Sequence, residues 1–237
     1  MNKNSNQSGK KRKGTGKFAR YVRVLAVALG VLALALTLLK VQQRISAHEF
    51  TTETTSRQFI LGNDVLEIPL NHMRFANQRE SDALDQADLI MTWPTGEGFT
   101  DANGDLFLKP DRIDSLVFLT VTRREMPLSM SDRLEAVYSK LFQGQPRRGP
   151  AGLALRKLRD GSGYDGEELA IAPTSIPPWV ARCQIDNGTG QAVCLRDVFA
   201  GAGLSIRYRF HRTHLPHWQR MERLVQKAVE QIVVTPQ

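Results

Sequence analysis

The sequence predicts an α+β domain, built from an antiparallel sheet with helices packed on one face and preceded by a transmembrane helix. Three observations predict this architecture. One uncharged apolar run lies near the N-terminus, short β-rich segments separated by turn residues follow it, and an amphipathic helix ends the chain. The chain has 237 residues. The part that follows the apolar run is long enough for one folded domain.

Positive charge is concentrated at the N-terminus. The chain has 32 Lys and Arg against 24 Asp and Glu, a formal net charge of +8. Residues 1–23 contain all of this excess, because they hold basic side chains and no acidic one. A nucleic-acid-binding domain should have its basic side chains on the folded surface. We therefore predict a basic cytoplasmic tail over residues 1–20 and no nucleic-acid partner.

Residues 24–39 form an apolar run without a charge, closed by Arg23 and Lys40. As a helix the run is about 24 Å long, and Tyr21 and Val41 extend it toward the thickness of a bilayer. We therefore predict an anchor over residues 21–41 in contact with inner-membrane lipid. A cleaved signal peptide is the alternative. The basic side chains before the run predict a cytoplasmic N-terminus and a periplasmic C-terminal part.

The polar, Thr-rich residues 42–57 predict a linker, so that residues 58–237 form the periplasmic domain. Hydrophobic, β-branched and aromatic residues bounded by Gly, Asn, Asp and Pro predict its first strands. These strands are expected at 58–61, 65–68, 89–93 and 115–121.

Ser129 and Asp132 match a capping box that opens a helix with apolar residues on one side. Further β-rich segments follow, and Pro216 stands at the start of a final amphipathic helix. We expect pairing of 153–158 with 168–172, a hairpin within 179–198, a strand at 204–210 and a helix at 216–233.

The chain has two cysteines, Cys183 and Cys194, on either side of a Gly-rich turn. If that turn centres on Gly188 and Thr189, antiparallel pairing places the two cysteines opposite each other. Facing positions of this kind are compatible with a disulfide, and export to an oxidising compartment favours one. Redox catalysis is the weaker interpretation, because the C-x-x-C spacing is absent.

His211, His214 and His217 have a spacing that could bind a metal on a continuous helix. Pro216 argues against such a helix, so we expect these histidines to lie exposed at a strand-to-helix turn and to bind no metal. No cofactor is predicted. We also find no nucleophile elbow, no Ser-x-x-Lys pair and no carboxylate dyad, so no catalytic residue is assigned.

Arg207, Arg209 and Arg212 are candidates for contact with an anion or a partner. Alternation along the strand places Arg207 and Arg209 on its exposed side. They could face a lipid headgroup, a cell-wall polymer or an acidic partner. The alternative is an ordinary solvated or salt-bridged sheet face.

Several short motifs resemble a family of uncharacterised, single-span, envelope-facing bacterial proteins with a disulfide hairpin before a C-terminal strand and helix. The resemblance covers roughly residues 58–235. The motifs are Glu67-Ile68-Pro69 with Asn71, Tyr164-Asp165-Gly166-Glu167, Ala181-Arg182-Cys183, Cys194-Leu195-Arg196, Tyr208-Arg209-Phe210, and Leu215 with Trp218. The resemblance implies an envelope location and a disulfide, and no activity.

The sequence favours a non-enzymatic, membrane-anchored periplasmic domain that binds an envelope protein or supports an envelope complex. One alternative is an envelope enzyme whose site combines residues distant in sequence. Another is a small immunity-like or inhibitor domain.

Overall fold

The structure is a computed structural model that describes Tyr21, residues 26–32 and residues 50–234. Residues 26–32 are helical. Among the described residues, no helix combines the length and the apolar character needed to cross a bilayer. The predicted tail 1–20, most of the predicted anchor 21–41 and residues 42–49 of the predicted linker lie outside the described residues.

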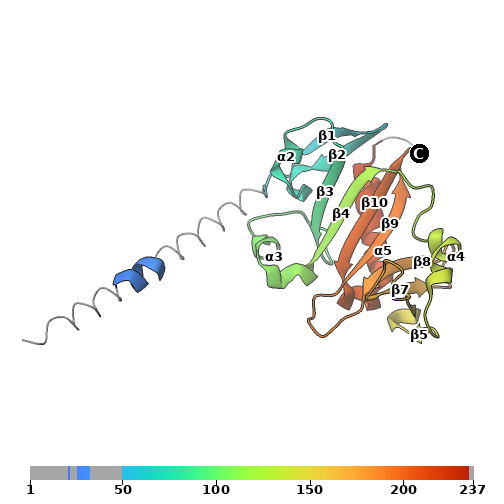
Figure 1. The fold of residues 1–237 in the computed structure, drawn as a ribbon. Coiled ribbons are helices and arrows are strands. Elements are labelled where there is room, and N and C mark those ends of the chain that lie inside the picture. Colours follow the sequence, from blue (N-terminus) through green and yellow to red (C-terminus); the bar gives the residue numbers. More distant parts are fainter. Residues whose placement is uncertain (1–20, 22–25, 33–49, 235–237) are drawn as a thin grey trace, which may run out of the picture. The chain divides into compact units, whose positions relative to one another are not determined.

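Two antiparallel sheets form the C-terminal unit (Figure 1). Strands β1 (Ser56–Leu61) and β2 (Asp64–Pro69) form a two-stranded hairpin, as predicted. The other sheet has eight strands in the order β3-β4-β10-β9-β8-β7-β6-β5. Its strands are β3 (Gln86–Thr92), β4 (Leu116–Arg123), β5 (Arg147–Arg148), β6 (Ala154–Lys157), β7 (Glu167–Ala172), β8 (Trp179–Gln184), β9 (Val193–Ala200) and β10 (Leu204–His211). The predicted antiparallel pairings are therefore confirmed.

The described helices of this unit are short except for the last one. The α-helices are α2 (Ala76–Arg79), α3 (Gly104–Leu108), α4 (Arg133–Ala136) and α5 (Trp218–Ile232). The 3-10 segments are Leu70–His72, Pro110–Ser115, Tyr138–Leu141, Pro150–Gly152 and Arg212–His217. The predicted C-terminal helix is confirmed, and it begins two residues after Pro216 because the preceding turn is 3-10.

The start of the helix predicted after Ser129 has the expected hydrogen bonds. The Asp132 carboxylate accepts from the backbone N–H of Ser129 at 3.0 Å, and the Ser129 hydroxyl accepts from the backbone N–H of Asp132 at 3.3 Å. The helix itself is broken at Val137 into α4 and the segment Tyr138–Leu141. It therefore covers less of the sheet than a continuous helix would.

Helices cover both faces of the large sheet, so the predicted arrangement with helices on one face is wrong. Buried residues of α5 share one core with alternate residues of the strands, among them Ala170 and Ala181. Leu134 of α4 instead packs with Leu169 and Val180, whose side chains point to the opposite face. Strand β7 is buried on both faces, so it lacks the polar alternation that would have revealed the second layer.

Asp64 attaches the β1–β2 hairpin to the large sheet. Its carboxylate is 1% exposed and accepts from the backbone N–H groups of Ala202 and Gly203 at 2.8 and 3.0 Å. Gly201 adopts φ +57°, and a Cβ there would lie 2.4 Å from the same carboxylate. The turn after β9 therefore requires glycine in order to hold the hairpin.

The folded domain begins before the end of the predicted linker. Phe50 stacks on Phe99 with ring centroids 5.2 Å apart, and β1 starts at Ser56. Of the described residues 50–57, Phe50 packs on the domain and Ser56 and Arg57 are part of β1. Ser56 and Arg57 are polar, and Ser56 is exposed while Arg57 is partly buried, so the sequence did not reveal that they belong to β1.

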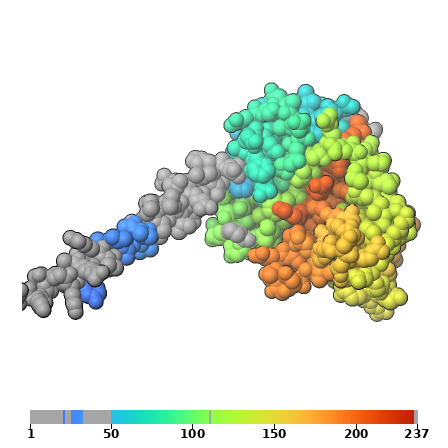
Figure 2. Space-filling view, in the orientation of Figure 1, coloured from blue at the N-terminus to red at the C-terminus, as the bar shows by residue number. Residues whose placement is uncertain are grey.

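One part of the large sheet is left without a helix. On the face opposite α5, α4 and its neighbours pack against β7 and β8, and no described helix packs over β4 and β10 (Figure 1). Figure 2 shows red atoms from the C-terminal part of the chain at the surface in the middle of this face. We refer to this area as the uncovered face.

Candidate functional site: an arginine-lined hollow on the sheet

The uncovered face places two of the predicted arginines next to aromatic and hydroxyl side chains. Arg209 of β10 pairs directly with Phe118 of β4, and Arg207 pairs with Thr120. Because residues i and i+2 share a face, all four side chains project from the same side of the sheet. Arg207 is exposed, and the other three are partly buried.

A third arginine joins this group from outside the sheet. Arg74 follows the 3-10 segment Leu70–His72, and its backbone N–H donates to the Asp88 carbonyl of β3 at 2.8 Å. Its guanidinium carbon lies 5.3 Å from the centre of the Phe118 ring, while that of Arg209 lies 4.6 Å from the same ring centre. Two cations therefore contact one aromatic ring.

These side chains surround a hollow of about 280 Å³. Its lining consists of three cations, one carboxylate, one hydroxyl residue and apolar groups. The lining residues are Arg74, Asp88, Leu89, Phe118, Leu119, Thr120, Leu195, Arg207 and Arg209.

The three arginines lack a carboxylate partner. None of the ion pairs formed by described residues includes Arg74, Arg207 or Arg209. Burial, and secondly the charge of Arg74, lower the pKa of the Arg209 guanidinium from its usual value. The hollow is therefore a region of uncompensated positive charge.

Asp88, the acidic residue in the lining, is occupied by neutral donors. Its carboxylate accepts from the Thr120 hydroxyl at 2.9 Å, from Gln78 Nε2 at 3.0 Å and from Gln86 Nε2 at 2.7 Å. These bonds hold the carboxylate at the β3 side of the hollow, away from ion-pairing contact with the arginines. The net charge of the lining remains positive.

Arg212 lies elsewhere. Its guanidinium forms an ion pair with Glu168, whose side chain is fully buried and also pairs with Arg147. It also donates to the Gln184 carbonyl at 2.7 Å. The structure thus brings Arg207 and Arg209 together and separates Arg212 from them. Arg74 and Phe118 could not be identified from the sequence, because neither stands near the arginine-rich strand.

Cys183 and Cys194 form a disulfide between facing positions of β8 and β9. Both side chains are fully buried. The predicted register is therefore confirmed, and the disulfide belongs to the core beneath α5 rather than to an exposed surface.

Two of the three histidines are engaged by hydrogen bonds to other groups of the domain. His211 is 7% exposed, which corrects the expected exposure, and its ring nitrogens lie 2.7 Å from the Thr213 hydroxyl and 2.9 Å from the Gly190 carbonyl. His214 Nε2 contacts the Asp114 carbonyl at 2.5 Å. Among the described residues, no three His, Cys, Asp or Glu side chains come close enough together to hold a metal.

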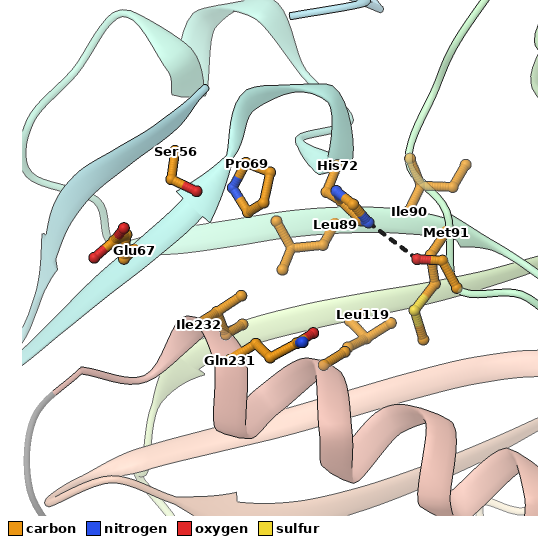
Figure 3. Close-up of a pocket in the computed structure, with 12 residues that line it drawn as sticks. Ser56, Glu67, Pro69, His72, Leu89, Ile90, Met91, Leu119, Gln231 and Ile232 are labelled. Carbon is orange, nitrogen blue, oxygen red and sulfur yellow. Dashed lines mark hydrogen bonds between the residues drawn. The ribbon is translucent and has the colours of Figure 1, made fainter. Parts of the chain in front are cut away.

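A second cavity, of about 310 Å³, lies between the hairpin, β3 and α5 (Figure 3). Its walls are mainly apolar. The polar side chains in its lining are Ser56, Glu67, His72 and Gln231. Burial lowers the pKa of His72 from its usual value, while the hydrogen bond to the Gly96 carbonyl acts in the opposite direction.

The polar groups of this cavity do not form a catalytic arrangement. His72 Nε2 lies 3.1 Å from the Gly96 carbonyl, and Nδ1 lies 3.1 Å from the Asn71 side-chain oxygen. Figure 3 shows Ser56 and Glu67 on the hairpin, apart from His72. Nucleophilic catalysis needs a nucleophile within hydrogen-bond reach of its base. Ser56 forms no such contact with His72, whose ring nitrogens face Asn71 and Gly96 instead.

No protein-family profile matches the chain, and no curated protein matches its sequence. Two solved structures are similar in fold. Smlt3025, an immunity protein of the Stenotrophomonas maltophilia type IV secretion system, has a TM-score of 0.51 at 12% identity, covering 77% of this chain and 94% of Smlt3025. The Neisseria meningitidis iron-regulated outer membrane lipoprotein FrpD has a TM-score of 0.46 at 14% identity, covering 76% of this chain and 95% of FrpD. The likeness to Smlt3025 shows a shared fold.

Proposed function

We propose that the chain is a membrane-anchored envelope protein whose C-terminal domain binds a protein partner through the uncovered face and catalyses no reaction. The observation that supports this proposal is the group of arginines without carboxylate partners on an exposed sheet face. An exposed charged surface of this kind steers and orients a partner of opposite charge.

The proposed location follows from the N-terminal sequence and the disulfide. Residues 1–20 are the cytoplasmic tail, residues 21–41 are the inner-membrane anchor in contact with lipid, and the domain lies in the periplasm. A buried disulfide between Cys183 and Cys194 is typical of an oxidising compartment. The proposed partner is therefore an envelope protein or one that enters the envelope.

Binding is favoured over catalysis by the composition of the hollow. Its unpaired ionisable groups have one sign, and its carboxylate is engaged by Thr120, Gln78 and Gln86. General acid-base chemistry requires a donor and an acceptor that can reach a substrate with suitable pKa values. An envelope enzyme remains the alternative from the sequence, and the cavity with His72 would be its place.

A narrower candidate is an immunity protein, which would bind a toxin and block it. The fold likeness to the immunity protein Smlt3025 favours this candidate. An immunity protein would also bind its partner through the uncovered face, since blocking a toxin requires a binding surface rather than an active site.

Site-specific photo-crosslinking in living cells tests the proposal. A photoreactive residue is placed at Ser205 or Thr122, which pair across β10 and β4 on the uncovered face. Lys227, exposed on α5, is the control position. We expect discrete protein adducts from Ser205 and Thr122 and none from Lys227. Adducts from Lys227 alone, adducts only with phospholipid, or no adduct at any position would contradict the proposal.

A further inference from the structure

We propose that the hollow between β3, β4 and β10 binds the carboxylate of an acidic side chain presented by the partner protein. This inference rests on the proposed function, and it names the chemical group that the uncovered face recognises. Arg74 and Arg209 are the principal contacts, and Arg207 lies at the exposed side of the same hollow.

Three other arginines that are partly or fully buried are paired with carboxylates, whereas Arg156, like the arginines of the hollow, has an aromatic contact and forms none of the ion pairs of the described residues. Arg133 pairs with Asp197, Arg196 pairs with Glu222, and Arg212 pairs with Glu168. These pairs join strands to helices and serve the fold. Arg74 and Arg209 have aromatic contacts but no carboxylate, so their charges are not needed to balance a charge of the domain.

Two guanidinium groups beside one ring repel each other. Both guanidinium carbons lie within 5.3 Å of the centre of the Phe118 ring, and burial together with the Arg74 charge lowers the pKa of Arg209. A bound anion removes this repulsion and supplies the missing partner. The arrangement is therefore prepared for a ligand with negative charge.

The charge and the apolar lining of the hollow favour a carboxylate over a phosphate. A guanidinium can bind either anion through two parallel hydrogen bonds, so the preference comes from the other lining residues. Asp88 lies in the same lining and repels a dianion more strongly than a monoanion. Phe118 and Leu195 offer apolar surface to the methylene groups of an Asp or Glu side chain.

The test measures binding at Phe118 itself in the full chain, so that ligand bound by the basic N-terminal residues does not contribute. Phe118 is replaced by 4-fluorophenylalanine, and its fluorine resonance is followed by NMR. The probe is acetyl-Gly-Glu-Gly-amide, and its neutral match is acetyl-Gly-Gln-Gly-amide. We expect a saturable shift with the Glu peptide and none with the Gln peptide.

Arginine variants establish which groups bind. Arg209→Gln and Arg74→Gln should each raise the apparent Kd about tenfold, because a charge-assisted hydrogen bond is lost. Arg209→Lys keeps the charge but loses the planar fork, so its Kd should lie between the wild type and Arg209→Gln. Arg223→Gln removes an exposed arginine of α5 and should leave the Kd within twofold.

Three results would overturn the inference: no saturable shift with the Glu peptide, equal weakening by Arg223→Gln, or equal binding of inorganic phosphate. Tighter binding of phosphatidylglycerol vesicles than of phosphatidylcholine vesicles at this fluorine would assign the hollow to lipid instead. Protein adducts from Ser205 without any response to the Glu peptide would refute this inference alone. Loss of those adducts would refute the proposed function.

Discussion

Nε of Arg196 donates to the Glu222 carboxylate at 3.0 Å, and the two side chains are only 8% and 13% exposed. Arg196 lies in β9 and Glu222 in α5. The register of strands β8 and β9 contains two residue pairs, Arg182–Leu195 and Cys183–Cys194. Next to these pairs, the guanidinium of Arg196 in β9 donates to the Val180 carbonyl of β8 at 3.0 Å. The Arg196 side chain therefore links β9 to β8 and attaches α5 to the sheet.

The same carboxylate accepts from two further core residues. Trp179 Nε1 donates at 2.8 Å, and the Tyr208 hydroxyl also donates to Oε2. The Arg196 guanidinium also donates to the Ser131 hydroxyl, next to α4, at 3.0 Å. The network thus connects the layers on both faces of the sheet, which gives this buried ion pair a structural role.

Glu222→Gln should lower the free energy of unfolding by about 3–5 kcal/mol, because it leaves Arg196 buried without a counter-charge. Urea unfolding followed by circular dichroism measures the change. The double variant Arg196→Met with Glu222→Leu should lose less than Glu222→Gln alone. A loss below about 1 kcal/mol for Glu222→Gln would contradict the role given to this pair.

Replacing Cys183 and Cys194 by Ser together should lower the free energy of unfolding by about 2–4 kcal/mol, because the disulfide constrains the unfolded chain. Partner adducts from Ser205 should persist at low temperature, since both cysteines are buried beneath α5. Mass spectrometry of the alkylated, non-reduced chain checks the bond. Two alkylated thiols would show that it does not form.

Alkaline pH should destabilise the domain through Tyr208. Complete burial and then the charge of Glu222 raise the pKa of Tyr208 well above its usual value. The unfolded tyrosine ionises near pH 10 while the folded one stays protonated, so stability falls as pH rises above about 10. The wild type should lose up to about 1.4 kcal/mol per pH unit more than Tyr208→Phe. If the unfolding free energies of the wild type and Tyr208→Phe changed equally between pH 8 and pH 11, this prediction would be wrong.

The same substitution should have unequal effects on stability at two arginines that are close in the sequence, Arg209 and Arg212. Arg212→Gln removes a partner of the fully buried Glu168 and should cost about 2–3 kcal/mol of unfolding free energy. Arg209→Gln removes no ion pair and relieves repulsion with Arg74, so the change should stay below about 1 kcal/mol. Thermal and urea unfolding of both variants measure the difference. Equal destabilisation would show that Arg209 serves the fold.

Local spacing predicted the elements well. The pairing of Cys183 with Cys194 follows from the position of the turn between them, and the final helix follows from its amphipathic pattern and Pro216. Both signals lie within short stretches of sequence. They required no knowledge of how the remaining strands are arranged.

Contacts between distant segments could not be predicted in this way. Alternation along the strand placed Arg207 and Arg209 on an exposed face. It could not show that Arg74, from a separate segment, contacts the same aromatic ring as Arg209. Nor could it show that Arg212 forms an ion pair with Glu168. The second helical layer was hidden for a related reason. A strand that is buried on both faces has no polar alternation, so its sequence does not reveal what lies on each side.

The proposed function requires that the arginine hollow binds a partner protein. The test compares the yield of the Ser205 photo-adduct between the wild-type chain and the double variant Arg74→Gln with Arg209→Gln. Arg223→Gln, which removes one exposed arginine of α5, is the control. We predict that the double variant loses about tenfold or more of the adduct at equal protein level, while Arg223→Gln retains it. An unchanged yield in the double variant would contradict the account.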